Sequence, residues 1–216
     1  MSVSHAAWYG TSIHDFLSAS DTQVLDALAA TSAFDVDLNQ RDAWREEIHI
    51  LRTTLRDVAS SGGDGWIYLE FDVPRLGTRI DAVVIAGAAV IPIEFKVGEA
   101  RYRRTDIDQT WDYGLDLKNF HEASHDASVF PLLVATAAAE GDSRWTMPHP
   151  DGVRPPCCAN VESLGLAVRR ALTEAKGKLI DGKAWGCASY RPTPTIIQAA
   201  RALYKHHTAD THTVFC

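Results

Sequence analysis

Three charged residues in two consecutive apolar segments could form a hydrolytic centre. Asp81 lies in the segment 78–86, and Glu94 and Lys96 lie in the segment 89–97. Side chains alternate along a strand, so Glu94 and Lys96 would share one face while Phe95 points to the other. The short connection between the two segments favours a hairpin, which can bring Asp81 beside Glu94.

Such a group calls for a cation, because burying an unpaired charge is costly and two neighbouring carboxylates repel each other. Mg2+ prefers oxygen ligands and is commonly held by one or two carboxylates. We therefore expect Mg2+ or Mn2+ at Asp81 and Glu94, where it would activate water and clamp a phosphodiester. Lys96 would position that water or stabilise the charge that develops on the phosphate. The competing interpretation is a structural salt bridge of Lys96 with Glu94 or Asp81, because the Asp…Glu-x-Lys pattern is short.

Three further residues could complete this site. Gln109 and Tyr113 are separated by four positions on the helix expected after the third strand, so they share one helix face. Glu47 lies one turn from Trp44, on a helix whose apolar stripe is expected to pack on the sheet. Its carboxylate could therefore reach the metal and assist in binding it.

A cluster of arginines could contact nucleic acid next to this site. Arg101, Arg103 and Arg104 follow the third strand, although the net charge of the chain is -7. Phosphate contacts provide affinity without sequence specificity, and a protein of acidic total charge must make them with local patches. The alternative is a solvated loop, and the same choice applies to Arg169 and Arg170 on a later helix.

The order of elements that would position these residues is a helix, three strands, a helix and a strand. Apolar spacing and Gly- or Pro-containing breaks define these elements. The expected ranges are a helix at 39–58 capped by Asn39, strands at 66–73, 78–86 and 89–97, a helix at 106–120 and a strand at 129–136. Short connections favour an antiparallel meander, and a strand after a helical crossover is expected to be parallel to its neighbour. The prediction is an α/β fold with a mixed central sheet flanked by helices.

The remaining segments are expected to be helical extensions of this core. Residues 1–38 include a helix-like pattern at 15–30, residues 140–158 have the composition of a loop, and helices are expected at 160–174 and 193–206. The predicted organisation is an N-terminal helical segment at 1–38, a core at 39–140 and a C-terminal helical extension at 141–216. The chain has no apolar run long enough for a membrane span and no signal-like N-terminus, so we expect a cytoplasmic protein.

These motifs resemble those of the RecB-type nucleases of the PD-(D/E)xK superfamily, whose core is the restriction-endonuclease-like fold. The similarity consists of Asp81, the run Glu94-Phe95-Lys96 and the pair Gln109 and Tyr113, and it covers residues 40–136. It implies that the backbone carbonyl of Phe95 joins Asp81 and Glu94 in binding the metal, that Lys96 serves catalysis, and that Gln109 and Tyr113 support the site and contact DNA. The proline that usually precedes the aspartate is absent, and Ile80 stands in its place.

A narrower similarity covers more of the chain. The runs Trp44-Arg45-Glu46-Glu47, Glu94 to Gly98, Trp111 to His121 and Tyr190 to Ile197 resemble the N-terminal region of bacterial Schlafen-group-3-like DNA/RNA helicases. This resemblance implies a nuclease part that works with a helicase motor in the same chain or another one. It suggests DNA or RNA as substrate and a role in antiphage defence. The sequence has no phosphate-binding motif of such a motor.

Two other functions compete with a nuclease. A nuclease fold that has lost turnover would act as a nucleic-acid-binding or interaction module. The second is a zinc peptidase. The sequence His121-Glu122-Ala123-Ser124-His125 matches the H-E-x-x-H signature of such enzymes, in which the two histidines would bind zinc on a continuous helix. Some members of the nuclease superfamily carry a four-cysteine iron–sulfur cluster, but the spacing of Cys157, Cys158, Cys187 and Cys216 favours reduced thiols.

Overall fold

The computed structural model describes residues 7–32, 38–60, 65–194 and 196–197. Its centre is one mixed sheet in the order β1-β2-β3-β4-β6-β7, with β5 pairing beside β6 on β4. The strands are β1 (Ala7–Ser12), β2 (Gly65–Val73), β3 (Thr78–Ala86), β4 (Ala89–Lys96), β5 (Ser128–Val129), β6 (Leu132–Ala135) and β7 (Cys157–Ala159). Strands β1 to β4 pair antiparallel with one another, whereas β5 and β6 pair parallel with β4, and β7 pairs parallel with β6.

Tight turns and one helical crossover produce this topology. Gly77 and Gly87, in the turns after β2 and β3, have φ values of 67° and 58°, which cost little only for glycine. A long helix, α4 (Arg104–Phe120), then carries the chain across the sheet so that β6 returns parallel to β4. The meander, the crossover and the flanking helices confirm the mixed α/β sheet expected from the sequence.

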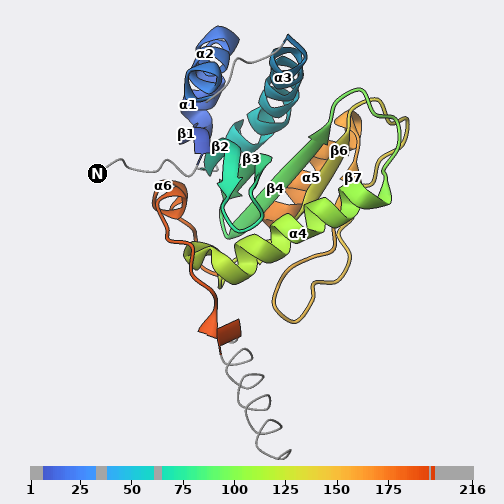
Figure 1. Cartoon of the computed structure of the whole chain (residues 1–216). Coiled ribbons are helices and arrows are strands. Elements are labelled where there is room, and N and C mark those ends of the chain that lie inside the picture. Colours follow the sequence, from blue (N-terminus) through green and yellow to red (C-terminus); the bar gives the residue numbers. More distant parts are fainter. Residues whose placement is uncertain (1–6, 33–37, 61–64, 195, 198–216) are drawn as a thin grey trace, which may run out of the picture.

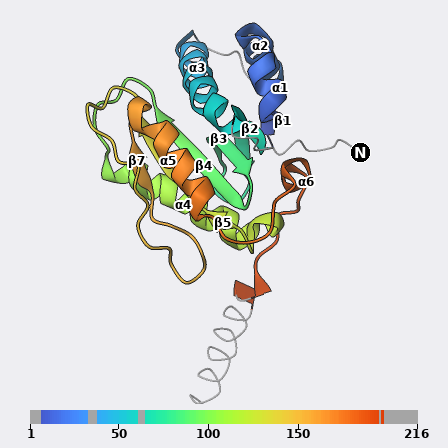
Figure 2. The ribbon, with the colours of Figure 1, turned by 180° about the vertical axis from the view of Figure 1, so that it is seen from behind.

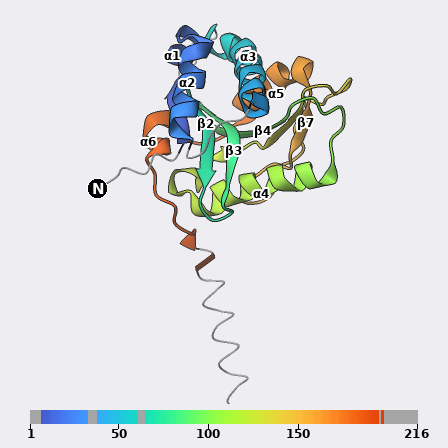
Figure 3. The ribbon, with the colours of Figure 1, turned by 45° about the horizontal axis from the view of Figure 1, so that its top comes forward.

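Helices cover both faces of the sheet. In Figure 1, α4 lies across the front of the sheet, and in the reverse view of Figure 2, α5 lies across the opposite face. The helix α3 lies beside α5, with α1 and α2 next to it, as Figure 3 shows. These other helices are α1 (Ile13–Ser18), α2 (Asp21–Thr31), α3 (Leu38–Ser60), α5 (Val161–Glu174) and α6 (Gly182–Gly186), and a 3-10 turn covers Glu122–Ser124.

Each face of the sheet carries its own hydrophobic core. The larger core joins α3 and α5 to the sheet and contains Trp44, Ile93 and Phe95. The smaller core lies under α4 and α6 and contains Tyr113 and Trp185. The alternation expected for β4 is therefore confirmed, because Ile93 and Phe95 point to the larger core and Glu94 and Lys96 do not.

Several expected elements are confirmed, and others are wrong. The strand at 78–86 agrees with β3, and the helix at 160–174 agrees with α5 to within one residue. The expected strand at 129–136 is divided into β5 and β6, and the expected loop at 140–158 ends in β7. The helix expected at 193–206 lies almost wholly outside the described residues.

The N-terminal segment differs most from its expected form. Residues Ala7–Ser12 form β1, which pairs with β2 along most of its length, so this segment is not purely helical. The single helix expected at 15–30 is two helices, because Ser20 caps the start of α2 through Gln23. Asn39 lies inside α3 and is not its cap.

The buried face of α4 also differs from the expected one. From the sequence, the apolar residues Ile107, Trp111, Leu115 and Phe120 are expected to lie near one face of this helix and to be buried, but all four are partly exposed. The buried side is formed by Thr110, Tyr113, Gly114, Asp116, Leu117 and Lys118. Gly114 permits this rotation, because a Cβ there would lie 2.5 Å from the ring of Pro131. No helix in the described part of the chain is long and apolar enough to cross a membrane.

The docking of α6 on β2 can be tested at Gly182. A Cβ there would lie 2.2 Å from Cβ of Trp66, which the strand holds in place. We expect Gly182→Ala to lower the free energy of unfolding by about 1–3 kcal/mol, the usual cost of overpacking. Chemical denaturation followed by circular dichroism measures this change.

Gly165→Ala in α5 is the matched control. The nearest atom to its new methyl group would be 3.6 Å away, and alanine favours a helix over glycine by about 0.5–1 kcal/mol. The control should therefore be as stable as the wild type or more so. A Gly182→Ala protein as stable as this control would show that α6 does not pack closely on β2.

Candidate functional site

Asp81 and Glu94 lie together at the point where β3 and β4 separate. The ladder between the strands ends at the pair Ala82 and Ile93, so Asp81 and Glu94 occupy the next opposed positions. Asp81 Oδ2 accepts a hydrogen bond of 2.7 Å from the backbone N–H of Phe95. The carboxylate thus replaces a backbone acceptor where the ladder stops. Both acids face the same site, which is the arrangement that the sequence analysis required.

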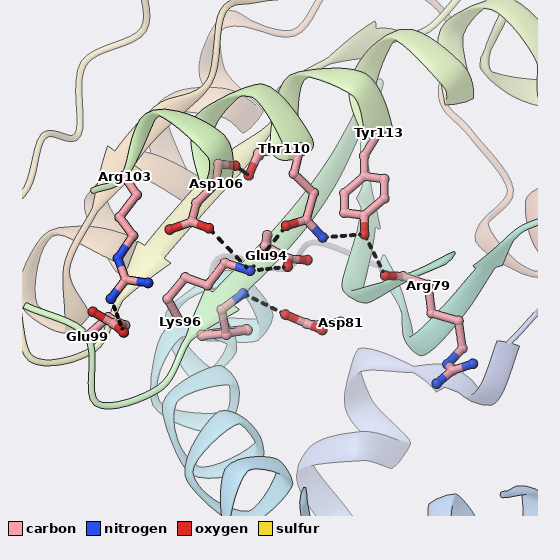
Figure 4. A network of polar contacts seen from close by, with 11 residues as sticks. Arg79, Asp81, Glu94, Lys96, Glu99, Arg103, Asp106, Thr110 and Tyr113 are labelled. Atoms are coloured by element: carbon pink, nitrogen blue, oxygen red, sulfur yellow. Dashed lines mark hydrogen bonds and ion pairs between the residues drawn. The ribbon is translucent and has the colours of Figure 1, made fainter. Parts of the chain in front are cut away.

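Lys96 lies among acidic and amide side chains beside this pair. Its Nζ donates hydrogen bonds to Glu94 Oε1 at 2.8 Å and to Gln109 Oε1 at 3.2 Å, and it lies 3.8 Å from Asp106 Oδ1. Figure 4 shows this ammonium between β4 and the facing helix α4. Burial alone would lower the pKa of Lys96, but the hydrogen bond and charge of Glu94 outweigh it and raise the pKa. Lys96 is therefore positively charged at neutral pH.

The pair on α4 continues this network to β3. Gln109 Nε2 donates to the hydroxyl of Tyr113 at 2.7 Å, and that hydroxyl donates to the backbone carbonyl of Arg79 at 3.0 Å. The amide orientation is fixed because Gln109 uses its oxygen for Lys96 and its nitrogen for Tyr113. Tyr113 is buried, so this chain of contacts ties Lys96 rigidly to the strand that carries Asp81.

Glu70 belongs to the same site, and the sequence analysis did not identify it. Glu70 lies on β2 between Leu69 and Phe71, which pair with Ala82 and Ile80 of β3, so it lies opposite Asp81. Its Oε1 accepts from Trp44 Nε1 and its Oε2 from Arg79 Nε, each at 2.7 Å. The sequence does contain one indication of Glu70: it is a carboxylate in the middle of an aromatic-rich strand, where a charged side chain needs partners.

The backbone is distorted at this point in both strands. Glu70 has a φ of 51°, and it is the one non-glycine residue of the described chain with positive φ. Tyr68 and Phe71 point into the same core although three positions separate them, and so do Ile80 and Val83. Unbroken strands would place such residues on opposite faces. Strained backbone of this kind is concentrated at functional sites.

Glu47 completes a cluster of four carboxylates. Burial and the charges of Glu70, Glu94 and Glu46 raise the pKa of Glu47 to about 8. Burial, followed by the charges of Glu94 and Glu47, raises the pKa of Asp81 well above its usual value. Burial also raises the pKa of Glu94, although Lys96 opposes the shift. The metal-free cluster therefore keeps its protons to a higher pH than isolated carboxyl groups do, and a bound cation would replace those protons.

The expected arginine cluster does not point into the site. Arg101, Arg103 and Arg104 are exposed around the start of α4. Arg103 pairs with Glu99 at 2.7 Å and Arg104 pairs with Asp108 at 2.9 Å. The two arginines of the later helix, α5, also have partners: Arg169 contacts Asp57, and Arg170 contacts Ser143.

The H-E-x-x-H segment lacks the continuous helix on which the zinc interpretation depends. The helix α4 ends at Phe120, and His121 has an extended backbone. His121 is buried and its Nδ1 contacts Ser124, whereas His125 Nε2 contacts the carbonyl of Arg191. Among the described cysteines, Cys157, Cys158 and Cys187 are free thiols.

The donor set of the carboxylate cluster fits a hard divalent cation. Glu94 Oε2 is a buried oxygen with no hydrogen-bond partner in the described structure. Carboxylate oxygens and a backbone carbonyl are ligands that Mg2+ and Mn2+ accept. The described residues contain no group of three or more acidic, histidine or cysteine side chains already arranged around one ion position.

Comparisons with known proteins identified no relative of this chain. No protein-family model matches the chain, and neither the curated proteins nor the solved structures gave a match. A functional proposal therefore depends on the geometry of the site and on the resemblance of its motifs.

The electrostatic crowding predicts that the acids destabilise the metal-free protein. Asp81→Asn removes one charge but leaves an oxygen to accept from the N–H of Phe95. In EDTA at about pH 8, we expect this variant to gain about 1 kcal/mol in free energy of unfolding, as substitutions at strained functional sites often do. Asp108→Asn, on the exposed side of α4, is the control and should lose less than about 0.5 kcal/mol.

The pH dependence of the metal-free protein follows from the same shifts. Between about pH 4 and pH 8, the folded protein keeps a proton on Glu47 that the unfolded chain has released, and the raised pKa of Asp81 acts in the same direction. The free energy of unfolding should therefore fall as the pH rises through this range, and fall less in Asp81→Asn. Equal slopes for wild type and variant would contradict the assigned repulsion.

Proposed function

We propose that this protein is a divalent-metal-dependent phosphodiesterase that hydrolyses nucleic acid. The observation that carries the proposal is the convergence of Asp81 and Glu94, the latter with a free buried oxygen, beside the ammonium of Lys96. A structural salt bridge explains one carboxylate next to one lysine. It does not explain why Glu47 and Asp81 lie at the same position, where burial and neighbouring acids raise the pKa of both carboxyl groups.

Each residue has a role in this proposal. Asp81, Glu94 and the backbone carbonyl of Phe95 would hold Mg2+ or Mn2+, and Glu47 would assist. When bound, the metal supplies a Lewis acid that lowers the pKa of water and polarises the phosphate. Lys96 uses two of its three N–H donors within the described structure, so one remains to contact a water or a phosphate oxygen.

Gln109 and Tyr113 are positioning residues in this proposal. Their hydrogen bonds fix the ammonium of Lys96 relative to β3, and catalysis depends on such geometry being held before the substrate binds. Arg101 is exposed and makes no contact with another described side chain, which leaves its guanidinium free for a phosphate. DNA is the substrate to be tested first, and RNA is the alternative.

The order of elements supports a restriction-endonuclease-like core. The helix α3, the meander of β2 to β4, the crossover helix α4 and the parallel strand β6 follow one another as in that fold. We also propose that this protein acts together with a helicase motor against foreign DNA. The resemblance of its motifs to helicase-associated nucleases implies this role.

A second candidate is a binding module without turnover. The observation in its favour is that the acids are already engaged by protein groups, because Lys96 contacts Glu94 and the N–H of Phe95 contacts Asp81. Such a protein would bind nucleic acid with an affinity that falls as salt rises, without needing a metal. Cleavage therefore decides between the two candidates.

The deciding experiment is cleavage of plasmid, single-stranded DNA and RNA in Mg2+ or Mn2+. We expect activity that EDTA removes and that Asp81→Asn, Glu94→Gln and Lys96→Ala each reduce by about 100-fold or more, as loss of a metal ligand or a transition-state contact does. Asp108→Asn and Lys178→Ala are matched controls with exposed side chains and should keep full activity.

A thermal-shift measurement separates metal binding from chemistry. Mn2+ should raise the melting temperature of wild type and of Lys96→Ala, but much less that of Asp81→Asn, because a ligand stabilises only a protein that binds it. Activity that persists in Asp81→Asn and Lys96→Ala would remove the enzyme proposal. Salt-dependent DNA binding without cleavage would establish the second candidate.

A further inference from the structure

A cavity of about 850 Å³ lies apart from the carboxylates, between β2 and the segment formed by α6 and residues 186–190. Its volume falls within the range of sites that hold small ligands. Aromatic side chains form much of its wall, including Trp66, Tyr68 and Phe71 from β2. Its outer part is bounded by the turn between β2 and β3.

Glycines keep this cavity open and define its shape. A Cβ at Gly186 would lie 2.2 Å from the hydroxyl of Tyr68, and one at Gly10 would lie 2.6 Å from the ring. The hydroxyl of Tyr68 donates to the carbonyl of Gly182 at 2.6 Å, which anchors α6 to the sheet. The wall is therefore set by packed and hydrogen-bonded elements.

The polar groups of the cavity are arranged around this aromatic wall. His121 lines it, is 1% exposed, and has an Nε2 without a partner in the described structure. Burial lowers the pKa of His121 to about 4, so the ring is neutral and can accept or donate one hydrogen bond. Asp72 adds a half-buried carboxyl, which can accept from an amino group.

Lys183 is the cation of the cavity lining that could receive an anion. Asp72 and Arg79 also line the cavity, but the charge of Arg79 is matched by Glu70. Lys183 is exposed and has no ion-pair partner among the described residues. Arg79 is bound to Glu70 and stacks on Trp8 at 4.2 Å, so it is fixed in place.

We propose that this cavity binds a nucleotide unit, with its base against the partly exposed ring of Trp66 and its phosphate at Lys183. Stacking on aromatic rings suits any base and is worth about 1–3 kcal/mol per base in nucleic-acid complexes. Asp72 and His121 are the hydrogen-bonding partners for the edge of the base. Other anions lack the aromatic ring that this wall fits, and neutral aromatic ligands do not use the lysine.

The cavity and the carboxylate cluster share Arg79. Arg79 lines the cavity, and its carbonyl accepts the hydrogen bond from Tyr113. A strand with one base in the cavity would thus run toward Asp81, two residues along β3. This connection rests on the proposed function, whereas binding of a nucleotide unit does not.

Isothermal titration calorimetry in EDTA tests the binding directly. We expect AMP and UMP to bind at least tenfold more tightly than ribose 5-phosphate, which lacks the base, and than adenosine, which lacks the phosphate. Lys183→Glu should weaken AMP binding by about tenfold, equivalent to about 1.4 kcal/mol. Lys178→Glu makes the same change of charge on an exposed residue outside the cavity and should weaken it less than twofold.

Further measurements distinguish a nucleic-acid strand from a free nucleotide and separate nucleotide binding from cleavage. A single-stranded tetranucleotide that binds more tightly than AMP identifies a nucleic-acid strand as the ligand, and equal affinities identify a free nucleotide. Ala188→Trp, which fills the cavity, should abolish both, with circular dichroism confirming its fold. Lys96→Ala should bind AMP as the wild type does, so a failed nuclease assay leaves this inference standing. Equal affinities for AMP and ribose 5-phosphate, or unchanged binding in Lys183→Glu, would overturn it.

Discussion

Repulsion among carboxylates within a folded sheet is the constraint that shapes this protein. Glu47, Glu70, Asp81 and Glu94 come from α3, β2, β3 and β4, and the charges of Glu70 and Glu94 raise the pKa values of Glu47 and Asp81. The fold holds them by giving three of them specific donors. Trp44 and Arg79 bind Glu70, the N–H of Phe95 binds Asp81, and Lys96 binds Glu94. Glu47 and Asp81 nevertheless keep their protons to a higher pH than isolated carboxyl groups do, and a bound cation would replace those protons, which is the physical basis for proposing one.

The same constraint explains why two cores enclose the sheet. The larger core fixes α3, and with it Trp44 and Glu47, against one face of the strands. The smaller core fixes α4, so that Gln109 and Tyr113 approach from the other side. Close packing holds these elements within narrow limits, and charged groups placed by such elements keep their geometry without a bound ligand.

Arg79 links the parts of the molecule that could act on a substrate. Its guanidinium stacks on Trp8 of β1 and binds Glu70, and its carbonyl receives the hydrogen bond of Tyr113. The strand β1 is therefore part of the support of the site, although it comes from the N-terminal segment. Changes in β1 would reach the carboxylates through the contacts of Trp8 with Arg79 and with Trp44.

The sequence by itself determined the elements whose pattern is local. Alternation with a period of two placed Glu94 and Lys96 on one face of β4, and glycines after β2 and β3 marked the turns of the meander. The spacing of four residues placed Gln109 and Tyr113 together. Most of the candidate site could thus be predicted, because strand and helix periodicities depend only on near neighbours.

Only the tertiary structure decided the features that depend on distant contacts. Glu70 joined the site because Trp44 and Arg79 bind it and because its backbone is distorted opposite Asp81. The face that α4 buries was decided by Pro131, which packs where Gly114 has no side chain. The pairing of β1 was decided by the free edge of β2. In each case the deciding partner is remote in sequence, and local periodicity contains no information about it.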